Sequence, residues 1–185
     1  MADPWKFLSS KILQTCSIFT LRKEHYRSPR TGRGHDFFLI DSRDWVNMIA
    51  LTPDSKVILV KQFRFGTRDF SLEIPGGMLE EGELPERAAT RELGEETGFG
   101  GDEPHLLGFV HPNPAFQTNR CYTYLIRKCT PRSSVHQDAT EEITEVQLTP
   151  LPEIPRLIRE GKITHALVIA AFYWFLARDG VLEMK

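Results

Sequence analysis

The sequence predicts an α+β domain of mixed sheets flanked by helices, preceded by an N-terminal β extension over residues 1–45. Its 185 residues, 41% of them hydrophobic, are the size of one ordinary domain with a buried core. The longest apolar run, residues 166–177, has 12 residues, whereas a bilayer-spanning helix needs about 20. We therefore expect a buried helix there, no membrane partner, and a main domain over residues 46–185.

Short strand-forming segments separated by turn residues recur along the chain. Residues 18–26, 36–41 and 46–51 are rich in strand formers, and the intervening stretches 28–35 and 41–44 are rich in turn formers. Further strands are expected over residues 56–63, 70–74, 106–110, 121–126 and 146–148. The apolar run VILV within residues 56–63 predicts that this strand is buried.

Three helices are expected after these first strands. The first covers residues 85–97, with proline at its first position and Gly98 as its C-terminal stop. The second is short and covers residues 152–159. The last helix is expected to be capped by Thr164 and to extend to about residue 177.

Charge is unevenly distributed, although the net charge is only −2. Residues 1–70 hold 12 Lys and Arg against 7 Asp and Glu, whereas residues 71–99 hold 2 against 8. An acidic block beside a basic one fits a divalent cation that meets an anionic substrate. On charge alone, a solvated helix face beside a basic tail explains the pattern better. The near-neutral total argues against a nucleic-acid partner, which requires a basic stripe.

The cysteines bear on the cellular compartment. Cys16, Cys121 and Cys129 are odd in number, which is typical of reduced thiols in a cytoplasmic protein. The chain also lacks the CxxC and HxxxH spacings that zinc sites use. We therefore expect a cytoplasmic location and no zinc site.

The most informative segment is the glutamate-rich first helix. Glu92, Glu95 and Glu96 are spaced i, i+3 and i+4, so their carboxylates share one helix face. Like charges at this spacing repel one another, and Mg²⁺ or Mn²⁺ neutralises such a set because both ions prefer carboxylate oxygens. Arg91 lies beside this face and can pair with Glu83 or Glu95. Three glutamates alone would indicate only a charged surface helix.

The complete spacing changes that interpretation. Residues 77–99 resemble the Nudix box, in which seven letters stand at fixed positions; here they are Gly77, Glu83, Arg91, Glu92, Glu95, Glu96 and Gly98. Chance agreement is on the order of 10⁻⁸ per start position. Phe99 occupies a place that is usually aliphatic, and Leu84 stands where a Ser or Asp cap would serve the helix better.

The resemblance extends over residues 40–178. The segments VKQFRFG (60–66), LEIPGG (72–77) and GKITHALVIAA (161–171) are similar to the ADP-ribose pyrophosphatase and nucleoside-diphosphate-sugar hydrolase branch of this family. That branch carries a proline about 15 residues past the box, where Pro114 stands here; Pro114 otherwise simply ends a strand. The resemblance implies a Nudix-type α/β/α sandwich with a mixed sheet.

The resemblance also implies roles for individual side chains. Glu92, Glu96 and the Gly76 carbonyl would hold the metal with support from Glu95, while Glu83 would orient Arg91 or hold a bridging water. Gly77 and Gly98 would be structural members of the box. In the DATEEITE segment, Glu141 is favoured over Glu142 as the catalytic base, and a solvated acidic turn is the alternative.

Substrate contacts are implied for Arg64, which would meet a phosphate, for Glu73, which would support that arginine or the ribose, and for Pro114. A structural surface pair between Arg64 and Glu73 is the alternative. Trp5, Trp45 and Phe116 are candidates for stacking a nucleobase, although aromatic side chains are more often part of a core. His165 is expected to cap or pack the last helix.

Together, these residues predict metal-dependent hydrolysis of the pyrophosphate bond of ADP-ribose or a related nucleoside diphosphate sugar, with Mg²⁺ or Mn²⁺ as cofactor. The products would be a nucleoside monophosphate and a sugar phosphate. The alternatives are hydrolysis of oxidised nucleoside triphosphates or RNA 5′ ends on the same fold, and a nucleotide-sugar sensor without activity. The resemblance further implies that the N-terminal extension forms a homodimer.

Overall fold

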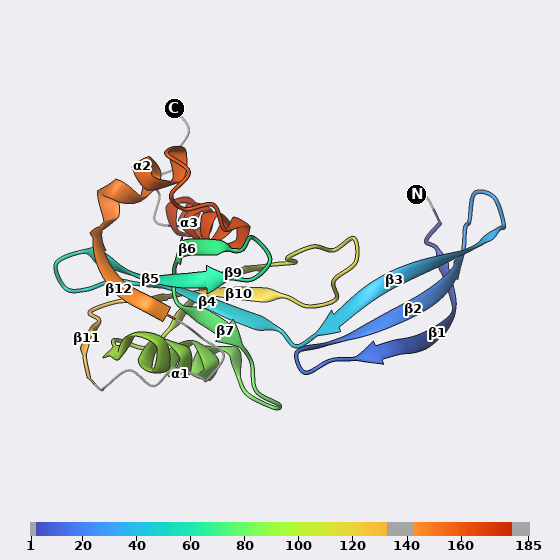
Figure 1. Ribbon diagram of the computed structural model, residues 1–185, viewed down its shortest axis with the longest axis horizontal. Coiled ribbons are helices and arrows are strands. Elements are labelled where there is room, and N and C mark those ends of the chain that lie inside the picture. The colour runs from blue at the N-terminus through green and yellow to red at the C-terminus, as the bar shows by residue number, and fades with distance from the viewer. Residues whose placement is uncertain (1–2, 133–142, 179–185) are drawn as a thin grey trace. The chain divides into compact units, whose positions relative to one another are not determined.

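The chain folds into two compact units, seen in a computed structural model that describes residues 3–132 and 143–178. The N-terminal unit comprises Met1–Asp44 and His111–Arg120, and the main unit comprises Trp45–Val110 and Cys121–Lys185 (Figure 1). His111–Arg120, which interrupts the main unit in the sequence, therefore belongs to the N-terminal unit. Each unit is described by itself below.

The N-terminal unit is built on a three-stranded antiparallel sheet in the order β1-β2-β3. Its strands are β1 (Lys6–Thr15), β2 (Phe19–Arg27) and β3 (Gly34–Ser42). The sequence predicted strands close to β2 and β3 but placed none over β1. Register shifts between Phe7 and Ser9 and between Ile12 and Gln14 interrupt the pairing of β1 with β2. Such irregularities break the two-residue alternation on which strand prediction depends.

The loop between β9 (His105–Val110) and β10 (Cys121–Ile126) belongs to the N-terminal unit and pairs with β3. The Ile40 N–H donates to the Phe116 carbonyl at 2.7 Å, and the Thr118 N–H donates to the Ile40 carbonyl at 3.2 Å. The Thr118 hydroxyl also donates to Asp41 Oδ1 at 2.7 Å. This loop carries Pro114, so backbone bonds to β3 fix the segment predicted to contact substrate.

The described part of the main unit contains one mixed sheet and two antiparallel sheets. The mixed sheet has the order β7-β4-β10-β9, with β4 parallel to β10 and the other neighbours antiparallel. Its strands are β4 (Trp45–Ala50), β7 (Gly76–Met78), β9 (His105–Val110) and β10 (Cys121–Ile126). The other sheets are β12-β5-β6 and β11-β8, formed by β5 (Lys56–Arg64), β6 (Asp69–Glu73), β8 (Phe99–Gly100), β11 (Thr130–Pro131) and β12 (Ile143–Pro150).

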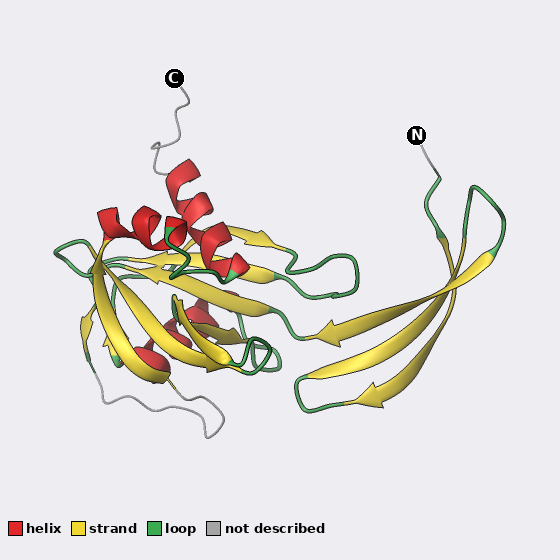
Figure 2. Ribbon diagram, turned by 45° about the horizontal axis from the view of Figure 1, so that its top comes forward, coloured by secondary structure: helices red, strands yellow, loops and turns green. Residues whose placement is uncertain are grey.

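Helices cover both sides of these strands, as Figure 2 shows. They are α1 (Pro85–Thr97), the 3₁₀ turn η1 (Leu151–Glu153), α2 (Ile154–Arg159) and α3 (Ala166–Arg178). The predicted Thr164 cap is wrong, because α3 begins at Ala166 and His165 occupies the cap position. The Leu167 N–H donates to His165 Nδ1 at 3.2 Å. No helix in the described part of the chain has the length and apolar character of a membrane span.

The central strands divide their side chains between two hydrophobic cores. Ile49 of β4 and Leu59 of β5 join the core that contains residues of α3, whereas Met48 and Ile58 join the core that contains residues of α1. The two cores therefore cover opposite faces of the same strands, one face each. This explains why the VILV run is entirely buried. The outcome is the predicted α/β/α layering.

The ends of α1 match the sequence signals. Pro85 occupies its first turn, and Leu84 at the cap position makes no side-chain hydrogen bond. Gly98 has φ of 74° and its N–H donates to the Gly94 carbonyl, which closes the helix in the left-handed conformation. Phe99 follows and packs against the core beside α1.

Two glycine-to-alanine substitutions in this segment should change stability in opposite directions. Gly98→Ala should lower the free energy of unfolding by about 1 kcal/mol, because alanine is strained at positive φ. Gly94→Ala should raise it by roughly 0.5–1 kcal/mol, because Gly94 is helical and an added Cβ meets nothing within 4 Å. Urea unfolding of both variants measures this, and destabilisation by Gly94→Ala would contradict the packing described.

Candidate active site

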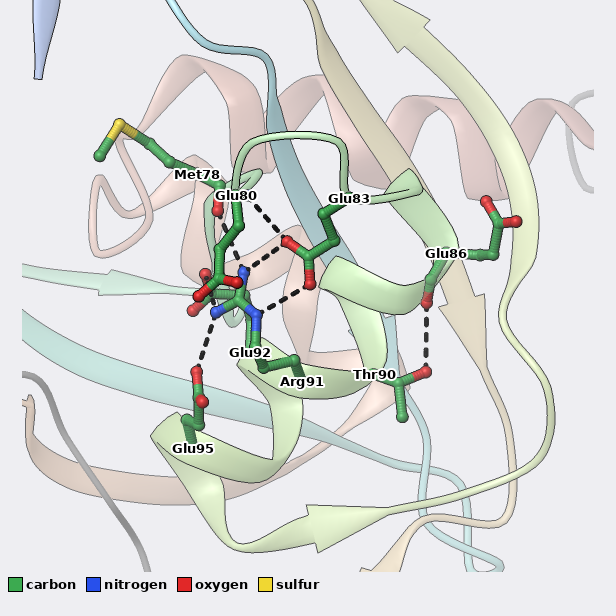
Figure 3. Close-up of polar contacts among 8 residues, drawn as sticks. All are labelled: Met78, Glu80, Glu83, Glu86, Thr90, Arg91, Glu92 and Glu95. Carbon is green, nitrogen blue, oxygen red and sulfur yellow. Dashed lines mark hydrogen bonds and ion pairs between the residues drawn. The ribbon is translucent and has the colours of Figure 1, made fainter.

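Arg91 is the centre of the acidic region formed by α1 and the segment before it (Figure 3). Its Nε and Nη2 donate to the two carboxylate oxygens of Glu83, each at 2.9 Å. Its Nη1 donates to Glu92 and to Glu95, also at 2.9 Å. Nη2 further donates to the Met78 carbonyl at 3.1 Å. One guanidinium thus joins three glutamates to the backbone of β7.

The contacts between Arg91 and Glu83 favour the charged form of both side chains. The hydrogen bond from Arg91 is the main cause that lowers the pKa of Glu83, and it outweighs the opposing effect of burial. The same hydrogen bond chiefly raises the pKa of Arg91 above its usual value. Glu83 also accepts the Glu80 N–H at 2.9 Å, so its carboxylate ties the loop before α1 to the helix.

Glu92 and Glu96 lie on the buried face of α1, against β7. Their residues are only 6% and 1% exposed, and Glu96 Oε2 accepts the Gly76 N–H at 2.9 Å. An added Cβ at Gly77 would lie 2.3 Å from Glu92 Oε1, so a side chain there would displace this carboxylate. The two glycines therefore let the strand approach both carboxylates closely.

The donor chemistry of this face fits a hard divalent cation. Two buried carboxylates one turn apart lie beside the backbone of Gly76, and oxygen donors of this kind are what Mg²⁺ and Mn²⁺ prefer. In residues 3–132 and 143–178, however, no three His, Cys, Asp or Glu side chains converge as metal ligands would. The carboxylates Glu141 and Glu142, predicted to supply the base, lie outside the described residues.

A second polar cluster lies on the β5–β6 hairpin of the main unit. Arg64 donates through Nε and Nη2 to the two oxygens of Glu73, each at 2.8 Å. The Glu73 side chain is 4% exposed and the Arg64 side chain 41% exposed. Burial raises the pKa of Glu73, but the hydrogen bond and charge of Arg64 outweigh it, so the net shift is downward. The predicted pairing is present, and a phosphate role for Arg64 stays a prediction.

His165 belongs to the same cluster, a link that the sequence did not indicate. Its Nε2 lies 3.8 Å from Glu73 Oε2, while its Nδ1 caps α3. The sequence predicted only a capping or packing role for His165, because α3 and the β5–β6 hairpin are about a hundred residues apart in the chain. No local pattern could reveal this contact.

Other predicted residues lie apart from these two clusters. Glu95 is at the outer edge of the acidic face, with its side chain 45% exposed. Pro114, Phe116 and Trp5 belong to the N-terminal unit, where the Trp5 ring meets the Phe37 ring edge-on at 5.4 Å.

An α/β/α sandwich in which a Gly-Gly strand packs against a glutamate-rich helix is the class of structure that the box predicts. A family model described as the NUDIX domain matches residues 42–172. Because this match covers more than half of the chain, the protein belongs to the Nudix family, as its sequence predicted.

Individual relatives support the same assignment. The chain is 28% identical over 140 residues to an ADP-ribose pyrophosphatase of Bacillus subtilis (strain 168), covering 76% of each protein. It is 29% identical over 175 residues to an ADP-ribose pyrophosphatase of Mycobacterium tuberculosis, covering 88% of this chain and 79% of the relative. A crystal structure of an ADP compounds hydrolase superposes with a TM-score of 0.84 at 21% identity, covering 98% and 96% of the two chains. This likeness confirms the predicted fold.

Replacing Arg91 by methionine should destabilise the protein by about 2 kcal/mol at pH 7, because charged groups lose their hydrogen bonds. The pKa of Glu83 is lowered in the folded state from its usual 4.5. The stability that this pair contributes is therefore fully present above pH 4.5 and is lost as the pH falls below it. Urea unfolding measures the free energy of unfolding of both proteins. The difference between wild type and Arg91→Met should be smaller at acidic pH than at pH 7. The matched control is Arg87→Met, at an exposed position of the same helix, and a pH-independent difference would contradict the pairing.

Proposed function

We propose that the protein hydrolyses the pyrophosphate bond of ADP-ribose or a related nucleoside diphosphate sugar. The products are a nucleoside monophosphate and a sugar phosphate. The observation that carries this proposal is the buried pair Glu92 and Glu96, held against Gly76 and Gly77 by α1. The relatives named ADP-ribose pyrophosphatase support the choice of substrate.

A divalent ion, Mg²⁺ or Mn²⁺, completes the proposed site through Glu92, Glu96 and the Gly76 carbonyl. When bound, such an ion offsets negative charge on phosphoryl oxygens and lowers the pKa of water. Arg91 keeps the acidic face assembled by holding Glu83, Glu92 and Glu95 together. Arg91 offsets part of the negative charge of α1, and a divalent ion held by Glu92 and Glu96 would offset more of it.

The remaining chemical roles fall to a base and a substrate-binding arginine. A carboxylate, Glu141 by preference or Glu142, would deprotonate or position the attacking water, with Glu95 as a further candidate. Arg64 would donate to a substrate phosphate through a charge-assisted hydrogen bond, supported by Glu73. Pro114 would line the substrate pocket.

The N-terminal unit would serve a homodimer, with residues 1–45 as the dimerisation extension and residues 46–185 as the catalytic domain. The sheet and its β1–β2 turn leave large apolar side chains exposed, among them Phe7 at 52%, Ile12 at 61%, Ile18 at 55% and Phe38 at 56%. Apolar patches of this kind mark interaction surfaces. A second copy of the chain is the proposed partner.

We also place the protein in the cytoplasm. Cys16, Cys121 and Cys129 are free thiols, the state that a reducing compartment maintains. Burial raises the pKa of Cys129 to about 11, which keeps this thiol protonated and unreactive.

A turnover panel tests the activity. With Mg²⁺ present, ADP-ribose should yield AMP and ribose 5-phosphate, and a chelator should abolish the reaction. Glu96→Gln and Glu92→Gln should each lower kcat by at least about a hundredfold, because each removes a carboxylate from the metal. The control Glu86→Gln makes the same change at an exposed position of α1 and should retain activity.

The same panel separates the alternatives. Cleavage of 8-oxo-dGTP or of a 5′-triphosphate RNA, without cleavage of any nucleotide sugar, would replace the proposed substrate class. Binding of a nucleotide sugar without any turnover would indicate a sensor. Full activity of Glu96→Gln with an unchanged metal requirement would contradict the proposed metal site.

Ile12→Glu tests the dimer. Light scattering should show a dimer for the wild-type protein at micromolar concentration and a monomer for Ile12→Glu, because a buried unpaired carboxylate opposes association. Lys11→Glu is the control, since it alters charge in the same strand without removing an apolar side chain. A monomeric wild-type protein would contradict the proposal.

A further inference from the structure

One chain of contacts in the main unit runs from the first residue before α3 to the β5–β6 hairpin. His165 accepts the Leu167 N–H at Nδ1, at 3.2 Å, and its Nε2 lies 3.8 Å from Glu73 Oε2. Because Nδ1 accepts a hydrogen bond, the ring proton of the neutral imidazole is on Nε2 and faces Glu73. Glu73 then accepts two hydrogen bonds from Arg64 at 2.8 Å.

We propose that His165 is a positioning residue for Arg64 and acts through the Glu73 carboxylate. The proposal rests on the proposed function, in which Arg64 binds a substrate phosphate. It adds the cap residue of α3, distant in sequence from the box and from the hairpin, to the determinants of substrate affinity.

The geometry explains why the orientation of Arg64 depends on the Glu73 carboxylate. Its side chain is 41% exposed, whereas that of Glu73 is 4% exposed, so the buried carboxylate fixes the orientation of the exposed guanidinium. The last torsion of a glutamate is broad, so each further contact, including the hydrogen bond from Ser71, narrows the orientations that the carboxylate can adopt. The His165 ring approaches Glu73 from α3, and the capping hydrogen bond fixes that ring in turn. Arg64 of β5, Ser71 of β6 and His165 at the cap of α3 therefore all restrict one carboxylate.

Protonation of His165 would remove the cap of α3 but would keep the Nε2–H that faces Glu73. A proton on Nδ1 removes the acceptor that caps α3. The charged groups that face the ring are Glu73 of β6 and Arg64 of β5, and Asn47 of β4 donates to the Leu167 carbonyl in the same first turn. Burial, against the opposing charge of Glu73, lowers the pKa of His165 from its usual 6.5. The ring is thus neutral at pH 7, where Nδ1 caps α3 and Nε2–H faces Glu73.

Replacement of His165 by asparagine separates the two roles of the residue. Asparagine is a good N-cap but lacks the atom that approaches Glu73. His165→Asn should therefore keep Tm near the wild-type value and raise KM for ADP-ribose about fivefold, the scale of one lost polar contact, with kcat little changed. His165→Ala should raise KM similarly and also lower Tm. His105→Asn, at an exposed position of β9, is the control and should change neither quantity.

A double substitution tests the route through Arg64. In an Arg64→Lys background, which lacks the two-pronged contact to Glu73, His165→Asn should raise KM no further. Equal effects of His165→Asn in both backgrounds would overturn the proposal, as would an unchanged KM in the single variant. Loss of Tm in His165→Asn without a change in KM would leave only the capping role and would also overturn it.

An NMR titration of the His165 ring provides a readout that does not depend on catalysis. Glu73→Gln should lower the pKa of His165 further, because the neighbouring negative charge is removed. A pKa unaffected by Glu73→Gln would overturn the proposal. If no nucleotide sugar is turned over, the proposed function fails, whereas this titration still decides whether the imidazole and Glu73 are coupled.

Discussion

The arrangement of the site depends on how one guanidinium distributes its hydrogen bonds. Arg91 holds a glutamate of the preceding loop with one edge and two glutamates of its own helix with another nitrogen. It also donates to the backbone of β7. The loop, the helix and the Gly-Gly strand are consequently fixed relative to one another, and the like charges of α1 are tolerated because they face a common cation.

Much of the fold followed from local patterns, and most exceptions have a physical reason. The bounds of α1 were predicted because proline at the start and glycine at the stop are strong signals. Strand β1 was missed because its irregular pairing breaks the alternation of side chains. The cap of α3 was assigned one residue too early, since a hydroxyl side chain was preferred there and an imidazole performs the task.

The site divides in the same way. The acidic face of α1 could be predicted because its spacing is a property of one helix, and the pairing of Arg64 with Glu73 because both lie on one hairpin. The contact of His165 with Glu73 could not, because it depends on how α3 packs against strands that are distant in sequence. The close approach of Gly77 to Glu92 likewise could not be predicted, because it depends on how β7 packs against α1.

The loop between β9 and β10 has a consequence for the modularity of the chain. Its backbone bonds join it to β3, so residues 111–120 complete a unit whose other part is Met1–Asp44. Deleting the first 44 residues would therefore not excise a detachable module. It would strip an internal loop of its hydrogen-bonding partners and expose backbone groups that the intact chain satisfies. An insertion in either part would alter the strand edge to which the other part is hydrogen-bonded.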